Sequence, residues 1–189
     1  MAKRPIMTSK TTLDLGCGKA RHPDSIGIDI NPDSNADIIH DLNVFPYPFE
    51  DNSFDVVFAD SIIEHLDDIP SVMNELHRIT RSGGKLIVIT PYFSSLDAFT
   101  DPTHKHFFSM RSFDYFTDSF PEYSYYSRSK FRKTKVKVTF WNLPRLKGIR
   151  PQHFLGANFL ATRFPTIYER FFAFILPAQE IRFELEVIK

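Results

Sequence analysis

The sequence predicts an α/β fold with a mostly parallel sheet and an antiparallel pair of strands at its C-terminal edge. Short Val-, Ile- and Leu-rich runs alternate with turn and helix signals through roughly the first 95 residues, as expected of strands buried on both faces of a parallel sheet. A glycine pair directly follows the first run. Nearer the C-terminus, two segments alternate polar and apolar residues, which is typical of strands with one solvated face.

The parallel part of the sheet is predicted from five apolar runs. These runs are Thr11–Leu15, Ile26–Ile30, Ala36–His40, Phe54–Ala59 and Lys85–Thr90. Between the last two runs, Asp68 can cap a helix that has Pro70 in its first turn. We expect Gly83-Gly84 to end this helix, and the strand–helix–strand unit implies a right-handed parallel crossover.

The C-terminal part is predicted to form the antiparallel edge. Phe131–Phe140 and Ile181–Val187 alternate and can pair with each other, and Ser109–Ser119 can form a helix before them. An aromatic, proline-punctuated insertion at about 141–180 separates the pair, with short helices near 154–162 and 165–176. Core packing is the first interpretation of its phenylalanines, followed by a hydrophobic acceptor pocket and then by peripheral membrane contact. The whole chain, 1–189, is interpreted as a single domain.

The composition excludes several classes of protein. Apolar residues make up 42% and charged residues 24% of the chain, which is a soluble globular composition. No stretch reaches the roughly 18 apolar residues of a membrane span, and the N-terminus lacks the apolar core of a signal peptide. Cys17 is the only cysteine, which excludes an internal disulfide framework. We therefore expect a cytoplasmic protein.

The zero net charge hides an asymmetry. Acidic residues predominate in the N-terminal part, whereas Tyr123 to Tyr168 contains no Asp or Glu. The two parts can screen each other in the fold, or the basic part can bind an anionic partner. Both interpretations stay open at this stage.

The strongest motif is LDLGCGKARHPDSIGIDI, residues Leu13–Ile30. Two glycines directly after a strand allow a tight turn and a close approach to a ligand, and Asp29 is placed to bind ribose hydroxyls. A dinucleotide site is less favoured. Its third glycine position is occupied by Arg21, and Asp29 comes only 13 residues after Gly16 (29 − 16) instead of about 20.

Together with the HDLN segment after the third run, this motif resembles the class I S-adenosylmethionine-dependent methyltransferases. The chain looks most like the broad branch that acts on small molecules, whose blocks are similar to LDLGCG, FDVVFADSIIEHL and GGKLIVITP here. The resemblance covers residues 11 to about 120. It implies a Rossmann-like fold, S-adenosylmethionine as cofactor, and methyl transfer as the activity.

The resemblance also implies which residues bind the cofactor. The glycine turn would line the methionine and ribose part, with Asp14 holding the amino group through water. Asp29 would bind the ribose diol, and Asp41 with the Leu42 backbone would recognise the adenine. The implied set is Asp14, Gly16, Cys17, Gly18, Asp29, Ile30, Asp41, Leu42, Asp60 and Ser61.

One departure from the family pattern concerns the first crossover. Only residues 16–25 join the first two strands, and Pro23 is among them, whereas a parallel crossover usually takes a dozen or more residues. We therefore expect the first helix to be short or missing and part of one sheet face to be uncovered. The aromatic helices of 154–176 or a second subunit, as in a homodimer, would then cover it.

A general base, if the acceptor must lose a proton, is expected in the loop Thr90–Ser109. His104 and His106 are the candidates, since histidine titrates near neutral pH. Their i, i+2 spacing lets at most one face the pocket if the loop is extended. The alternative is that such a histidine braces the loop. No metal site is expected, because Asp101, His104 and His106 have no evident supporting partner.

The acceptor is not identified by the sequence. A small-molecule acceptor, and in particular an apolar metabolite, is the first hypothesis. The alternatives are an RNA or lipid methyltransferase that uses the basic segment 128–150, and a non-catalytic scaffold subunit that binds the cofactor. Lys133, Lys135 and Lys137 are predicted to share one strand face, either as a solvated edge or as a phosphate-binding surface.

Overall fold

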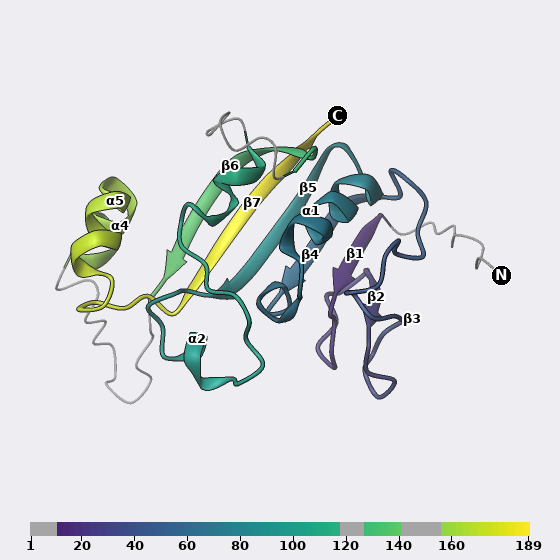
Figure 1. The fold of residues 1–189 in the computed structure, drawn as a ribbon, viewed down its shortest axis with the longest axis horizontal. Coiled ribbons are helices and arrows are strands. Elements are labelled where there is room, and N and C mark those ends of the chain that lie inside the picture. Colours follow the sequence, from purple (N-terminus) through teal and green to yellow (C-terminus); the bar gives the residue numbers. More distant parts are fainter. Residues whose placement is uncertain (1–10, 118–126, 141–155) are drawn as a thin grey trace.

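The computed structural model describes residues 11–117, 127–140 and 156–189. A seven-stranded sheet of order β3-β2-β1-β4-β5-β7-β6 organises it (Figure 1). Strand β7 is antiparallel to β5 and β6, and the other pairs are parallel. The strands are β1 Thr12–Leu15, β2 Ile26–Asp29, β3 Ile38–Ile39, β4 Phe54–Asp60, β5 Thr80–Pro91, β6 Lys130–Thr139 and β7 Glu180–Ile188. The predicted fold class is confirmed.

The longest helix, α1 (Ile69–Ile79), forms the crossover from β4 to β5, and Asp68 caps it as predicted by accepting a hydrogen bond from the Ser71 amide at 3.1 Å. The remaining helical segments are short. They are η1 Ile63–His65, α2 Asp97–Thr100, η2 Ser112–Phe116, α4 Ala157–Arg163, α5 Pro165–Ile167 and the π-helical turn η4 Tyr168–Phe172.

The prediction that Gly83-Gly84 ends α1 is wrong. The helix ends at Ile79, and Thr80 already pairs with Phe54 as the first residue of β5. The register then shifts, so that Lys85 pairs with Val56. The glycines lie in this irregularity of the strand, where Gly83 takes a φ of +75° that favours glycine.

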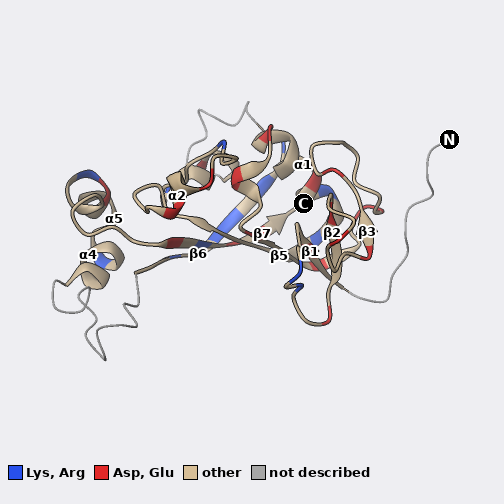
Figure 2. Ribbon diagram, turned by 90° about the horizontal axis from the view of Figure 1, so that it is seen from below, with Lys and Arg blue, Asp and Glu red and all other residues tan. Residues whose placement is uncertain are grey.

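The main core lies between the sheet and the layer that contains α1 and α2 (Figure 2). Leu13, Val57 and Leu86 from three neighbouring strands are completely buried, as are Val72 and Leu76 of α1. Burying side chains of this size stabilises the fold by about 1.5–3 kcal/mol each. This core fixes the carboxyl ends of the strands, where the sequence places the cofactor-binding residues.

The connection from β1 to β2 contains no helix, as predicted. Polar contacts hold it instead. The Asp14 carboxylate accepts a hydrogen bond from the His22 amide at 2.7 Å, and the Arg21 guanidinium pairs with Asp37 at 2.7 Å. The segment is thereby tied to the end of β1 and to the entry of β3.

The sheet face opposite α1 is only partly covered in the described chain. Val56, Phe58 and Ile89 are half-buried on it, and the His22 ring stacks on Phe58 with centroids 4.0 Å apart. Helices α4 and α5 lie beyond one end of β6, far from β1 and β2 (Figure 1). The aromatic helices therefore do not take the place of the missing helix.

The expectation that the phenylalanines of the aromatic segment are core residues is also wrong for most of them. Phe171 and Phe174 are 66% and 72% exposed, and Ile175 is 71% exposed. Only one side of the segment, with Ala161 and Tyr168, faces the rest of the molecule and is buried. The reason is its position at the sheet edge, where no second layer lies over it in the described residues. Residues 154 and 155 of the first predicted helix lie outside the described residues.

Strand β6 contains a bulge that changes the prediction for its lysines. Lys133 pairs opposite Leu185, but Lys135 pairs opposite Glu184, the next residue of β7. The one extra residue in β6 between these two lysines puts their side chains on opposite faces of the sheet. Lys133 lies on the helical side and pairs with Asp114, whereas Lys135 lies on the other face beside Glu184. The three lysines therefore do not share one face.

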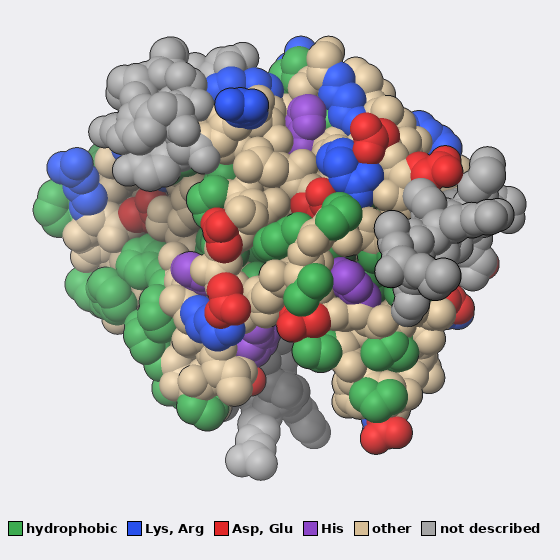
Figure 3. Space-filling view, turned by 45° about the vertical axis from the view of Figure 1, so that its right-hand side comes forward, with side chains coloured by type: hydrophobic (Ala, Val, Ile, Leu, Met, Phe, Trp, Pro, Cys, Tyr) green, Lys and Arg blue, Asp and Glu red, His purple; other side chains and the backbone are tan. Residues whose placement is uncertain are grey.

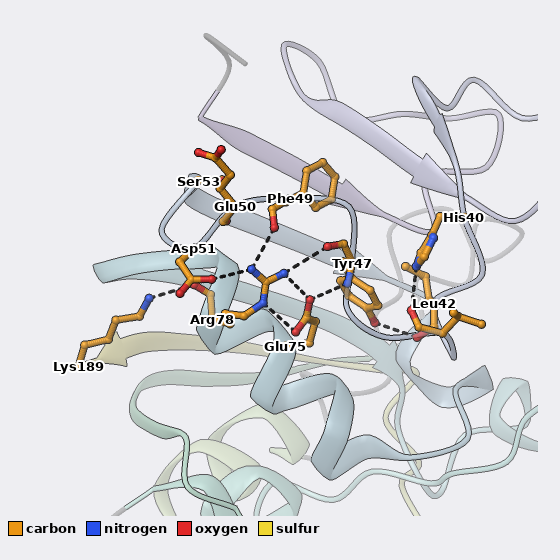
Figure 4. Close-up of polar contacts among 11 residues, drawn as sticks. His40, Leu42, Tyr47, Phe49, Glu50, Asp51, Ser53, Glu75, Arg78 and Lys189 are labelled. Carbon is orange, nitrogen blue, oxygen red and sulfur yellow. Dashed lines mark hydrogen bonds and ion pairs between the residues drawn. The ribbon is translucent and has the colours of Figure 1, made fainter. Parts of the chain in front are cut away.

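A partly buried ion pair within α1 is hydrogen-bonded to the loop that follows β3 (Figure 4). The Arg78 guanidinium contacts Glu75 at 2.5 Å and donates to the Tyr47 and Phe49 carbonyls at 3.2 and 2.9 Å. The Tyr47 amide donates to Glu75 at 2.6 Å, and the Tyr47 hydroxyl donates to the Leu42 carbonyl at 2.9 Å. Arg78 thus positions the loop that carries the predicted adenine-binding residues.

Replacing Arg78 with methionine should lower the free energy of unfolding by about 2 kcal/mol, because the buried Glu75 carboxylate loses its cation. The matched control is Arg81→Met, whose ion pair with Asp55 is well exposed on both sides and should contribute less than about 1 kcal/mol. Urea denaturation measures both variants. Equal losses would show that the Arg78 network does not position the loop.

Candidate cofactor site

The glycine turn after β1 packs against the segment that follows β4. The Gly16 amide donates to the Ile28 carbonyl at 2.8 Å, and Gly16 and Gly18 take φ values of +65° and +50°. A Cβ atom on Gly16 would lie only 2.4 Å from Cγ1 of Ile62. Position 16 therefore requires glycine both for its backbone conformation and for the close approach of Ile62.

Asp29 stands at the end of β2 with its carboxylate fixed by two backbone donors. Its Oδ2 accepts from the Gly18 amide and its Oδ1 from the Asn31 amide, both at 2.8 Å. Each carboxylate oxygen keeps a further lone pair, so the fixed group can still accept hydrogen bonds from a ribose diol. The neighbouring Ile30 is 62% exposed and offers an apolar surface beside it.

Several acidic side chains lie close enough together at the carboxyl ends of the strands to raise the pKa values of two of them. Burial raises the pKa of Asp14, which also feels the charge of Asp60. Burial likewise raises the pKa of Glu180 at the start of β7, with further contributions from Asp60 and Asp97. A cationic ligand would relieve this repulsion. Acidic and histidine side chains lie among apolar ones on the face drawn in Figure 3.

Cys17 lies inside the turn and fills space. It is buried, and a Cβ on Gly27 would lie 2.7 Å from its sulfur. Burial, together with Asp14 and Asp29, raises the pKa of the thiol to about 11. The neutral thiol is therefore a poor nucleophile, and any contact with the cofactor would be a packing contact.

Asp41 and Leu42 follow β3 directly. The half-buried Asp41 accepts from the Asn43 amide at 2.9 Å, and the buried Leu42 is held through its carbonyl by Tyr47. The His40 amide donates to the Asp29 carbonyl at 2.8 Å. These contacts bring the predicted adenine-binding and ribose-binding residues to one edge of the sheet.

Asp60 ends β4, and Ser61 follows it in an unusual conformation. Ser61 has a φ of +53°, its amide donates to the Ile89 carbonyl at 2.9 Å, and its hydroxyl donates to Asp60 at 3.0 Å. A positive φ at a serine is uncommon, and it turns the chain sharply from β4 toward η1. Such backbone strain is concentrated at functional sites.

His104 and His106 have different neighbours, as their spacing predicts. His104 is largely buried. Its Nδ1 lies 2.9 Å from the Ala98 carbonyl, and its Nε2 lies 3.9 Å from Oε1 of Glu64. His106 Nε2 is buried without a hydrogen-bond partner among the described residues. A role of either ring as general base stays a prediction.

Two acidic residues at this end of the sheet were not singled out from the sequence. Glu64 in SIIEHL is 1% exposed, and Glu180 starts β7. Glu64 could have been found as a lone acid among apolar residues shortly after a predicted strand. The position of Glu180 at this end of the sheet depends on its pairing with Pro91, and the sequence does not specify that pairing.

A separate cavity of about 590 Å³ lies between β6, η2 and the α4–α5 segment. Lys133, Val136, Ala161 and Glu169 are among its lining residues. None of the predicted cofactor-binding residues lines it, so it is not the cofactor site.

Comparisons with known proteins agree with this geometry. Residues 13–88 match a family model described as a methyltransferase domain. The demethylmenaquinone methyltransferase of Geobacillus kaustophilus (strain HTA426) is 25% identical over 156 residues, covering 68% of this chain and 66% of that protein. The chain spans less than two thirds of the length of the curated relatives that it matches.

Solved structures share the fold. A SAM dependent methyltransferase from Archaeoglobus fulgidus aligns with a TM-score of 0.61 and 18% identity, covering 93% of this chain and 85% of that one. A chain from the complex between the Haloferax volcanii Trm112 methyltransferase activator and the putative methyltransferase aligns with a TM-score of 0.58 and 16% identity, covering 100% of this chain and 87% of that one.

The strand order and the family match define an α/β domain of the methyltransferase type. Residues 13–88 match the methyltransferase domain family, which agrees with the predicted resemblance to the class I S-adenosylmethionine-dependent methyltransferases. S-adenosylmethionine is the methyl donor of this class. Within the ranges that the structure describes, no helix is long and apolar enough to cross a membrane.

Replacing Gly16 with alanine should lower the free energy of unfolding by about 2–4 kcal/mol, because left-handed strain and the clash with Ile62 add. The control is Gly83→Ala, which has a similar positive φ but no atom within 4 Å of the new Cβ, and it should show the strain alone. Thermal and urea unfolding compare the two. A Gly16 variant no less stable than the Gly83 variant would contradict the close packing of Ile62.

Proposed function

We propose that this chain binds S-adenosylmethionine at the glycine turn and transfers the methyl group to a small, apolar acceptor. The single observation that carries the proposal is the Asp29 carboxylate, which two backbone amides fix beside a turn that must be glycine. The acidic field at the strand ends supports a cationic ligand there.

The reaction needs little covalent chemistry from the protein. The cofactor would supply a methyl group bound to a sulfonium sulfur. As the acceptor lone pair forms its bond to the methyl carbon, the bond from sulfur to that carbon breaks and the sulfur becomes a neutral thioether. The residues of the chain orient the reactants. Asp29 would hold the ribose, Asp41 the adenine, and Asp14 the amino group, while Asp60 and Ser61 would flank the methyl group.

Apolar side chains around the loop after β5 support an apolar acceptor. Leu96, Phe99 and Phe107 of this loop are exposed, and the last two rings stack at 4.8 Å. The loop begins at the carboxyl end of β5, where ligands of open α/β sheets bind. Phe93 of the same loop contacts the exposed Phe174 with ring centroids 5.4 Å apart. These side chains would form an apolar surface next to the proposed methyl-transfer site.

The charges of β6 support a small acceptor over RNA. Arg132 lies 3.2 Å from Glu186, and Lys135 lies 3.4 Å from Glu184. Cations that already have carboxylate partners are poorly placed to neutralise phosphates. Residues 141–150 of the predicted basic segment lie outside the described residues.

Calorimetric titration of S-adenosylhomocysteine tests the cofactor site. Asp29→Asn should weaken binding roughly 10- to 100-fold, because a charge-assisted hydrogen bond contributes about 1.5–3 kcal/mol. The control is Asp33→Asn, an exposed acid in the same connection, which should bind like the wild type. Equal affinity of all three proteins would contradict the assignment of Asp29.

Turnover tests the activity apart from binding. We expect S-adenosylhomocysteine to form from S-adenosylmethionine in the presence of small apolar hydroxyl or amine acceptors, and not with RNA. Product detection by mass spectrometry reports the methylated acceptor directly. Cofactor binding without product across the acceptor panel would favour the scaffold alternative.

A further inference from the structure

A cluster of metal-ligating side chains lies between η1 and the loop after β5. Ligand atoms of Glu64, His65 and His104 all lie within 4.8 Å of one another. The predicted cofactor contacts use none of the three.

Backbone hydrogen bonds bring the two segments together. The Lys105 and His106 amides both donate to the Glu64 carbonyl, at 2.8 and 3.2 Å. The Lys105 ammonium also pairs with Asp67 at 2.5 Å, just beyond η1. The loop after β5 is therefore clamped onto η1, and His104 is held opposite Glu64.

The partner of His104 decides which ring nitrogen is free. Its Nδ1 lies 2.9 Å from the Ala98 carbonyl, and a carbonyl can only accept, so Nδ1 carries the proton. In the neutral ring, Nε2 then has a lone pair. This nitrogen faces Oε1 of Glu64 at 3.9 Å.

The same reasoning applies to His65 through a longer chain of contacts. The Thr103 hydroxyl donates to the Asp101 carboxylate at 2.7 Å, so it accepts a hydrogen bond from Nδ1 of His65 at 2.9 Å. Nδ1 therefore carries the proton, and Nε2 of the neutral ring is left as a ligand. Metal-ligating histidines are commonly oriented by a hydrogen bond from their other ring nitrogen, and here Thr103 relays that support from Asp101 to His65.

The Glu64 carboxylate completes the cluster. It is 1% exposed, and its polar neighbours are the Thr90 hydroxyl, its own backbone amide and Nε2 of His104. A buried carboxylate that no cation balances is costly. Two imidazole lone pairs and this buried carboxylate meet here, and a cation or an added proton would balance its charge.

We propose that Glu64, His65 and His104 bind a divalent transition-metal ion, with Asp101 and Thr103 as supporting residues. Two imidazoles and one carboxylate suit Zn²⁺, Co²⁺ or Fe²⁺ and leave coordination positions open. The expectation of no metal site considered Asp101, His104 and His106 together. In this proposal Asp101 acts through Thr103, and His106 has no role.

Titration of the metal-free chain with Zn²⁺ and with Co²⁺ tests the site without any need for activity. We expect one ion per chain, with a Co²⁺ absorption spectrum typical of nitrogen and oxygen ligands. Glu64→Gln and His104→Gln should each weaken binding at least about tenfold. Thr103→Val keeps all three ligands but removes the support of His65, and should cost about 10- to 100-fold.

His40→Gln is the matched control, because it removes a half-buried imidazole that is 24 positions before Glu64 (64 − 40) and outside the cluster, and it should leave affinity and stoichiometry unchanged. Circular dichroism and S-adenosylhomocysteine binding check that the variants fold. If the Glu64 variant does not fold, the Thr103→Val variant still tests the site, because Thr103 is exposed and its replacement should not disturb the core. A wild-type chain that binds neither ion, or variants that bind as tightly as it does, would overturn the proposal.

Discussion

Ten residues connect β1 to β2, and this short connection constrains the rest of the molecule. A parallel neighbour requires the chain to return along the strand, a distance of about 13 Å for four residues. Ten extended residues reach about 33 Å, so the return is feasible without a helix. No helix of this connection then covers the open sheet face beside β1, and the contacts of Arg21 with Asp37 and of His22 with Asp14 hold the segment instead. The consequence is a sheet with one well-covered face and one partly open face.

The polar segment also sets the chemistry of the site. Asp14 and Asp29 face a turn whose amides are the nearest donors, and Asp60 and Glu180 add further negative charge. Burial and mutual repulsion raise the pKa values of Asp14 and Glu180, so their charged forms weaken the fold unless a cation is near. A sulfonium and an ammonium bound there would offset that cost. Cofactor binding at the proposed site would therefore be coupled to stability.

Local signals predicted the strands, the cap at Asp68 and the missing first helix, because each depends on neighbouring residues. Other features depend on distant parts of the chain. The bulge between Lys133 and Lys135 follows from the register with β7, and the exposure of Phe174 follows from the position of its segment at the sheet edge. The glycines after α1 are compatible with a helix stop or a strand irregularity, and only the pairing of β5 with β4 decides between them.

Within the candidate site, the sequence indicated the residues that follow strands but not those that meet across loops. Asp29 and Asp41 could be predicted, because the carboxyl ends of parallel strands lie along one edge. Glu64 and His104 are 40 positions apart (104 − 64). Their proximity depends on the Lys105 and His106 amides that bond to the Glu64 carbonyl. Backbone hydrogen bonds of this kind have no residue signature, so spacing alone grouped His104 with Asp101 and His106.

The segment from Ser61 to His65 links the two halves of the site. The positive φ of Ser61 directs the chain over the glycine turn, where Ile62 packs on Gly16. Two residues later, Glu64 and His65 point toward the loop after β5. The same sharp turn therefore borders the proposed cofactor site and presents the proposed metal ligands. A side chain at position 16 would push Ile62 outward and displace both, so the requirement for glycine would extend from the proposed cofactor site to the proposed metal site.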